Sequence, residues 1–276
     1  MKTKKKRLWK LVMGRITRAS KENIYNLFQK GVDLSVSLNW SASGGANCST
    51  ACRLHHASTS KQKIGGCYAI TNESMRPAVR ESAEKKSRLS PLEIIGKAYI
   101  QLGELFTELE LQGLRLVWFR FSSVGSVPRK SQIPIAQRKR FETLLRMLVQ
   151  ALVSKGVKIH FPVESRSKRD YYQGIVGDLC VVRLSLQSRK AEVTEEAACS
   201  FVVGEEIRLH NSKSVKRDRI KLARERASER YKKTGRKTIV CPAIVSTFQK
   251  RPKKIQCGKC DACERKNVDV VYPLHV

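Results

Sequence analysis

The stretch Leu114-Arg-Leu-Val-Trp-Phe-Arg-Phe121 is a compact run of apolar and aromatic residues that ends at the polar Ser122. Runs of this length and composition are typical of a buried strand. Residues 91–111, before it, have the periodicity of a helix. After it, a second helix is predicted from about Pro134 to Gly156, with Phe141, Leu144, Leu145, Leu148 and Leu152 on one face. Helices that alternate with buried strands predict a sheet covered by helices.

Five further strand-like runs extend this pattern. They are residues 32–40, 157–161, 179–186, 199–203 and 238–243. Several are apolar on both faces, which favours a parallel sheet with covered faces. We therefore expect an α/β fold, either a partial (β/α)6 barrel or an open parallel sheet. In both architectures ligands bind at the carboxyl ends of the strands.

The composition along the chain divides it into three parts. Residues 1–30 predict a basic arm followed by a short helix, with Ser20 as its N-cap and Gly31 at its end. Residues 31–240 contain the predicted strands and form the α/β domain, which includes a long loop over residues 41–66. Residues 241–276 form a cysteine-rich extension that we expect to bind a metal or cluster.

The chain carries 55 Lys and Arg against 24 Asp and Glu, a formal net charge of +31. Such an excess indicates a polyanionic partner, and nucleic acid, DNA or RNA, is the first expectation. No apolar run approaches the ~18 residues that cross a bilayer, and the N-terminus lacks a signal-peptide pattern. We therefore expect a cytoplasmic protein with no membrane partner. Its nine cysteines then indicate thiolate ligands and not disulfides.

The clearest motif is Cys257-Gly-Lys-Cys260-Asp-Ala-Cys263, with Cys241-Pro242 upstream as a source of a fourth thiolate. Three thiols at three-residue steps can wrap one compact centre. This spacing is typical of 4Fe-4S ligation, although the order of the segments is inverted here. A zinc site with four cysteines is the main alternative, and unligated surface thiols are a weaker one.

A second group of cysteines follows the first predicted strand. Cys48, Cys52 and Cys67 could hold three irons of a second cluster and leave the fourth iron open to a small molecule. His55 and His56 lie in the same loop, so a zinc site with three cysteines and one histidine is the alternative. Cys180 and Cys199 lie within apolar runs and are expected to pack as small apolar residues.

These pieces together resemble the phage and plasmid family called gene product eighty-eight and, more distantly, phage proteins of the radical-SAM type. The resemblance covers about residue 34 to the end. It is carried by Cys48, Cys52, Cys67-Tyr68-Ala69, LRLVWFRFSSVG, Cys241-Pro242, Cys257-Gly-x-Cys260-x-x-Cys263 and VVYPLH. The gap between Cys52 and Cys67 is longer than in the usual radical-SAM motif.

The resemblance implies a partial (β/α)6 barrel with a catalytic 4Fe-4S cluster on Cys48, Cys52 and Cys67. An auxiliary cluster would then be held by Cys241, Cys257, Cys260 and Cys263. It also implies that S-adenosylmethionine binds the open iron and that Tyr68 packs beside the cluster. Strand-end polar residues are the candidates for the rest of a cofactor pocket: Arg120, Ser122, Glu164 and Ser185.

The segment from Ser214 to Lys233 predicts a strongly cationic helix. We expect phosphate contacts from its nine cations, Lys216, Arg217, Arg219, Lys221, Arg224, Arg226, Arg230, Lys232 and Lys233. The leading hypothesis is a cytoplasmic, nucleic-acid-binding iron–sulfur protein that modifies a base in DNA or RNA. The alternatives are a zinc-containing DNA-binding protein with no enzymatic activity and a structural component of a ribonucleoprotein.

Overall fold

One mainly parallel sheet organises the computed structural model. The described residues are 25–30, 33–38, 40, 81, 88–111, 113–121, 126–186, 192, 195, 197–203, 213–249 and 260–273. Within them the sheet has eight strands in the order β1-β2-β3-β4-β5-β6-β8-β7. β1 pairs with β2 in an antiparallel manner, and every other neighbouring pair of described strands is parallel.

The strands are short, with four to six residues each. They are β1 (Tyr25–Lys30), β2 (Asp33–Leu38), β3 (Arg115–Arg120), β4 (Lys158–Val163), β5 (Val182–Leu186), β6 (Cys199–Val203), β7 (Lys237–Val240) and β8 (Val268–Pro273). The helices are α5 (Pro91–Leu111), α6 (Ile135–Ser154), α7 (Arg166–Val176), α9 (Lys213–Thr234) and α10 (Pro242–Phe248), with a 3-10 turn at Lys130–Gln132.

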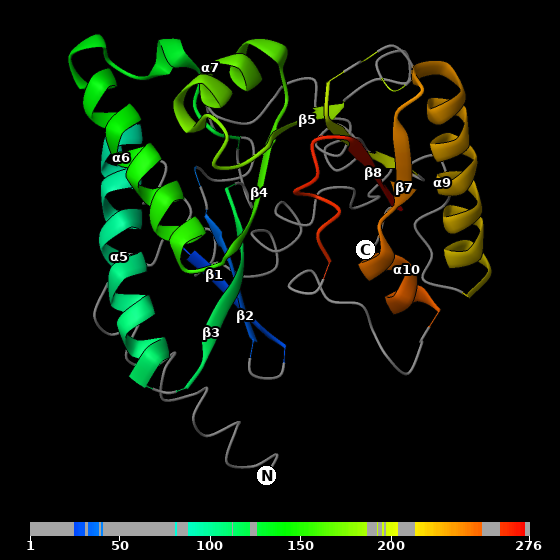
Figure 1. The fold of residues 1–276 in the computed structure, drawn as a ribbon, viewed down its shortest axis with the longest axis horizontal. Coiled ribbons are helices and arrows are strands. Elements are labelled where there is room, and N and C mark those ends of the chain that lie inside the picture. The colour runs from blue at the N-terminus through cyan, green and yellow to red at the C-terminus, as the bar shows by residue number, and fades with distance from the viewer. Residues whose placement is uncertain are drawn as a thin grey trace.

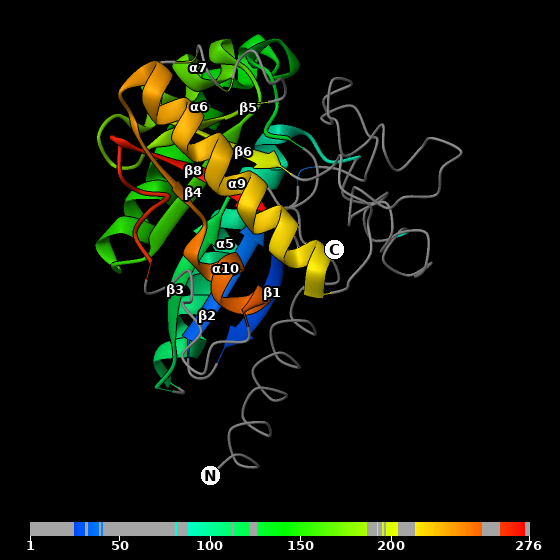
Figure 2. The same ribbon diagram turned by 90° about the vertical axis from the view of Figure 1, so that its right-hand side faces the viewer.

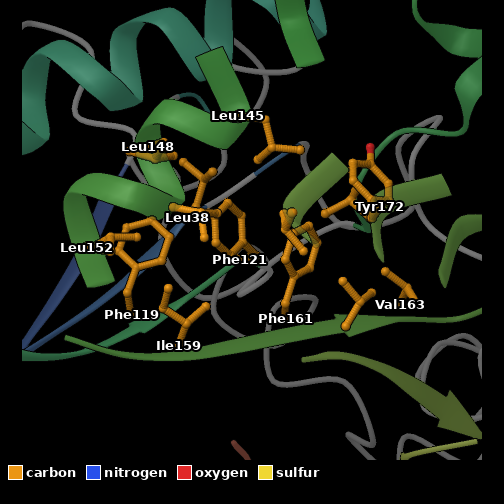
Figure 3. Packing of buried hydrophobic residues seen from close by; sticks show 14 of the residues in the cluster. Leu38, Phe119, Phe121, Leu145, Leu148, Leu152, Ile159, Phe161, Val163 and Tyr172 are labelled. Atoms are coloured by element: carbon orange, nitrogen blue, oxygen red, sulfur yellow. The ribbon is translucent and has the colours of Figure 1, made fainter. Parts of the chain in front are cut away.

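Four helices cover one face of the sheet. In Figure 1 α5 and α6 lie on the left and α9 on the right, with the strands between them. The main apolar core joins these helices and α7 to the strands. Figure 3 shows part of it, where Leu145, Leu148 and Leu152 of α6 face Phe119, Phe121 and Phe161 of the sheet. Phe121 and Phe161 stack with ring centroids 4.2 Å apart.

The predicted fold class is confirmed. The parallel strands follow the order of the chain from β2 to β6 and curve into an open half-barrel with helices outside (Figures 1 and 2). The face that carries the helices is the outer face, and the opposite face is the inner face. All six predicted strand runs correspond to strands of this sheet, and the helices predicted over residues 91–111, 134–156 and 214–233 correspond to α5, α6 and α9.

The helix predicted at the end of the N-terminal arm is wrong for residues 25–30. They form β1, which pairs with β2 so that Tyr25 lies opposite Leu38 and Lys30 opposite Asp33. Only residues 31 and 32 separate the two strands, so a hairpin with its interstrand hydrogen bonds prevails over the local helical periodicity.

The cysteine-rich extension is continuous with the sheet. β8 belongs to residues 241–276 and inserts between β6 and β7, where it is parallel to both. The domain boundary expected after residue 240 therefore falls inside one sheet. In this parallel pair the start of β8 lies beside the start of β7, and Cys241, directly after β7, lies beside Val271 near the end of β8.

None of the helices in the described ranges combines the length and apolar character that crossing a bilayer would require.

Candidate metal centre on the inner face of the sheet

The inner face carries polar and sulfur-containing side chains. Along each strand, side chains alternate between the two faces. In β4, Ile159, Phe161 and Val163 pack into the outer core, so His160 lies on the inner face. The same alternation places Arg183 of β5 and Tyr272 of β8 there, because their neighbours Val182, Leu184 and Val271 join the outer core.

Three of the predicted ligands meet at this face. Cys241, Cys260 and Cys263 belong to one small cluster with Val270 and Tyr272. Cys241 comes directly after β7, and its N–H donates to the carbonyl of Val271 at 2.8 Å. Cys260 and Cys263 lie in the turn that precedes β8. Three of the four predicted tail ligands therefore pack in one small cluster, as thiols and not disulfides, and their binding of a metal stays a prediction.

Tyr272 contacts one of these thiols. Its hydroxyl lies 3.0 Å from Sγ of Cys263, within hydrogen-bond distance. Burial raises the pKa of the Tyr272 phenol well above 10, and negative charge on Cys263 and on Cys241 raises this pKa further. The phenol is therefore protonated at neutral pH and available as a hydrogen-bond donor to a thiolate.

Arg183 holds the turn before β8 against the sheet. Its side chain is fully buried. The guanidinium donates to the carbonyls of Cys263, at 3.1 and 3.2 Å, and of Arg265, at 2.9 Å. It also donates to the carbonyls of Cys199 and Val268. These acceptors are all neutral carbonyls, so Arg183 places a buried positive charge beside the cysteine cluster.

Glu264 attaches the same turn to β4. Its Oε1 accepts a hydrogen bond from the backbone N–H of Ile159 at 3.1 Å. Burial raises the pKa of the Glu264 carboxyl. Glu264 and Arg183 together fix the Cys260–Cys263 turn to two neighbouring strands.

His160 and Arg120 carry polar atoms with no partner in the described structure. His160 Nε2 and Arg120 Nε are both buried, and neither has a hydrogen-bond partner among the described residues. The imidazole lies between Trp118, at a centroid distance of 6.0 Å, and Tyr272, at 6.3 Å. Burial lowers the pKa of His160 well below 6.5, and the charges of Arg120 and Arg183 lower it further, so this side chain is neutral at neutral pH.

The other cofactor candidates are placed differently. Glu164, after β4, forms an ion pair with Lys168 and accepts a hydrogen bond from Ser126. This buried contact joins the loop after β3 to α7. Ser185 is half-buried on the inner side of β5. Ser122 and Tyr68 lie outside the described residues, as do Cys48, Cys52, Cys67 and Cys257.

Within the described ranges, no three histidine, cysteine or acidic side chains are grouped so that they could hold a metal ion. The fourth expected thiol, Cys257, lies outside these ranges. The donor chemistry nevertheless fits a thiolate-binding metal, because three thiols share a cluster with a hydroxyl donor and lie beside a buried guanidinium.

The cations of α9 divide into two groups. Arg219 and Arg230 are buried. Arg230 forms an ion pair with the fully buried Asp269 at 2.7 Å, and Arg226 pairs with Glu192 at 3.3 Å. These ion pairs attach α9 to Asp269 of β8 and to Glu192. The prediction of phosphate contacts is therefore limited to the exposed cations of the helix, Arg217, Lys221, Arg224, Lys232 and Lys233. Lys216 is half-buried and lies over the ring of Phe248.

Sequence reasoning missed three residues of the site, namely His160, Arg183 and Tyr272. Each is a polar residue within a mostly apolar strand, and strict alternation would have placed each opposite the core. Arg183 gave the strongest signal, because it interrupts the run Val181-Val182-Arg183-Leu184 with a charge.

Comparison with known proteins adds no assignment: no family model, curated protein or solved structure matches the chain.

Proposed function

We propose that the protein is a cytoplasmic nucleic-acid-binding protein whose tail cysteines hold a metal centre, an iron–sulfur cluster. Cys241, Cys257, Cys260 and Cys263 would be the ligands. The observation that carries the proposal is that the side chains of Cys241, Cys260 and Cys263 pack together. In the sequence, Cys241 precedes α10, and Cys260 and Cys263 follow it. The bound iron–sulfur cluster would transfer electrons or form a rigid crosslink between β7 and β8.

The charge around the cysteines favours such a centre. Four thiolates with a divalent metal, or with a 4Fe-4S core of charge 2+, carry a net charge of about −2. Burying this charge is costly unless cations and hydrogen-bond donors lie nearby. Arg183 supplies a fully buried cation at the Cys263 carbonyl, and Tyr272 supplies a hydroxyl at its sulfur. Within the described residues the guanidinium of Arg183 donates to neutral carbonyls, and a metal held by thiolates would supply it with an anionic neighbour.

Nucleic acid is the partner that the charge favours. The net charge of +31 comes from the whole chain. Several cations on α9 remain exposed after others have been used for ion pairs. Lys and Arg side chains that neutralise phosphates supply sequence-independent affinity.

The resemblance implies that a second cluster binds S-adenosylmethionine, and together with the charge of the chain this suggests a reaction on a base of DNA or RNA. The iron–sulfur cluster for this reaction would be held by Cys48, Cys52 and Cys67, and Tyr68 would pack beside it. These residues lie outside the described ranges. Among the described residues, His160 Nε2 and Arg120 Nε are buried polar atoms without a hydrogen-bond partner, and they are the candidates for contact with the polar part of a small ligand.

A zinc-containing DNA-binding protein is the second candidate, because the same four thiols would satisfy tetrahedral zinc. Purification without oxygen, followed by metal and sulfide analysis, separates the two. The iron–sulfur proposal expects about four iron and four sulfide per cluster and absorbance near ~400 nm. About one zinc per chain and no iron would favour the second candidate. Absence of both metals after anaerobic reconstitution would end both.

Two variants show where the metal is bound. Cys263→Ala should lose the metal of the tail site, because the substitution removes one of the four proposed cysteine ligands. Cys199→Ala is the matched control, since Cys199 is a buried thiol that packs in the outer core. Equal metal content in both variants would contradict the assignment of the tail cysteines.

A further inference from the structure

A groove lies beside the edge strand β7. It has a volume of about 550 Å³ and is lined by α9, β7 and α10. Its apolar floor includes Ile239 and Val240 of β7 and Val245 of α10, and its rim includes Arg224, Ser228 and Tyr231 of α9. Among the described strands β7 is the last in the sheet order, so the groove lies at that edge of the sheet. Figure 2 shows α9 lying next to β7 and α10 in this region.

One exposed stripe of α9 runs along this rim. Arg217, Lys221, Arg224, Ser228 and Tyr231 follow at steps of four and three residues, and all five are exposed. This spacing places them on one face of a helix. The acidic residues Asp218, Glu225 and Glu229 lie about a quarter-turn away, because each residue advances about 100° around the helix. The stripe therefore combines three cations with a tyrosine and has no carboxylate within it.

Tyr231 has the setting of a stacking residue. Its side chain is 57% exposed although it borders an apolar floor. In single-strand-binding proteins, aromatic side chains stack with bases while cations follow the phosphates. A duplex keeps its base faces stacked inside and offers the groove only its backbone.

From this arrangement we infer that the α9–β7–α10 groove binds single-stranded nucleic acid, with a base on the Tyr231 ring and phosphates along Arg217, Lys221 and Arg224. The inference rests on the proposed nucleic-acid binding and specifies the strand state and the site. The apolar floor accommodates the base, and the cationic stripe neutralises the backbone. An acidic peptide is the competing occupant that the same charges could attract.

The test measures binding of a labelled ~20-nucleotide single strand, and of the matching duplex, to the full chain at several salt concentrations. Tyr231→Ala should weaken single-strand binding by about 5- to 150-fold, the range for loss of one stacked base. It should leave the salt slope and duplex binding nearly unchanged. Tyr231→Phe, which keeps the ring, should bind as the unmodified protein does.

The cations are tested through the salt dependence. Lys221→Gln with Arg224→Gln should reduce the slope of log affinity against log salt by about 1.4, since each phosphate contact with a single strand contributes about 0.7. The matched control is Lys139→Gln with Arg140→Gln, two exposed cations on α6. The control pair on α6 should lower the slope by less than the pair on α9 does.

The outcomes separate the two proposals. If the unmodified protein binds neither single strand nor duplex, the proposed nucleic-acid function fails and the groove assignment fails with it. If binding is strong but Tyr231→Ala has no effect, or the α6 pair lowers the slope as much as the α9 pair, the groove assignment alone is overturned. Displacement of the single strand by an equal concentration of a polyglutamate peptide would also overturn it in favour of an acidic partner.

Discussion

The two faces of the sheet differ in chemistry although they share every strand. The outer face holds Phe119, Phe121, Ile159, Phe161 and Val163 in one apolar core with four helices. The inner face holds His160, Arg183 and Tyr272 next to a cluster of cysteines. Burial of apolar area stabilises the outer face, whereas buried polar groups on the inner face require specific partners. We therefore assign stability mainly to the outer face and place the proposed metal centre on the inner face.

The largest expected effect is on the outer face. Phe161→Ala removes a fully buried ring that stacks on Phe121 and contacts Tyr172 at a centroid distance of 5.2 Å. Because a cavity remains, the free energy of unfolding should fall by about 3–5 kcal/mol. Urea unfolding measures it. Ile100→Ala, at an exposed position of α5, should cost less than about 1 kcal/mol, and equal costs would show that the core is wrongly placed.

On the inner face, Arg183→Met should lower the free energy of unfolding by about 3 kcal/mol, because it leaves buried carbonyls of the Cys263–Val268 segment without their hydrogen-bond donor. The free energy of unfolding from urea titration checks this value. Arg169→Met provides the comparison, since the Arg169–Asp170 pair is partly exposed and such pairs contribute about 0–1 kcal/mol. If Arg183→Met is as mild as Arg169→Met, the turn does not depend on the guanidinium.

His160 should give the inner face a pH dependence. Its pKa in the folded protein is held below 6.5 by burial and by Arg120 and Arg183. Below about pH 6.5 the unfolded chain takes up a proton that the folded chain does not, so stability falls as pH falls towards the lower folded pKa. The slope should be up to about 1.4 kcal/mol per pH unit.

The substitution His160→Gln removes this titration. The difference in free energy of unfolding between the unmodified protein and the variant, measured by urea titration from about pH 7 to pH 5, should change with that slope. All other histidines cancel in the difference. Parallel stability curves would place His160 in a more solvated position than the structure gives it.

The smallest expected effect is on the chemical labelling of two thiols that pack with the outer core, Cys180 and Cys199. Burial raises the pKa of Cys180 and of Cys199 to about 12 each. Thiolate is the reactive form, so iodoacetamide at about pH 8 should label neither residue in the native protein. Mass spectrometry of peptides from native and urea-unfolded protein checks this. Rapid native labelling of Cys199 would indicate that β6 opens to solvent.

The sequence predicted six of the eight described strands, but it predicted neither β1 nor β8, nor the place of β8 in the strand order. Strand order depends on tertiary contacts, and β8 pairs with β6 and β7 across chain gaps that no local pattern reports. Helix α7 was also missed, because its apolar face is narrow. Only Tyr172, Ile175 and Val176 form it, among charged neighbours.

The site was partly predictable for a related reason. Cysteine spacing is a local signal, so Cys260 and Cys263 could be identified together with Cys241. The partners of these cysteines come from distant strands: Arg183 lies 80 residues before Cys263. The exposure of Tyr231 was not predictable either, because an aromatic residue on a helix is as compatible with the core as with the open groove that it borders.

The central claim is that the thiol after β7 and the tail thiols bind one metal centre. X-ray absorption at the metal edge of anaerobically purified protein measures the ligands directly. The account predicts a shell of sulfur neighbours at about 2.3 Å that loses one cysteine ligand in Cys241→Ser. A shell of nitrogen and oxygen, or a sulfur shell that Cys241→Ser leaves unchanged, would contradict it.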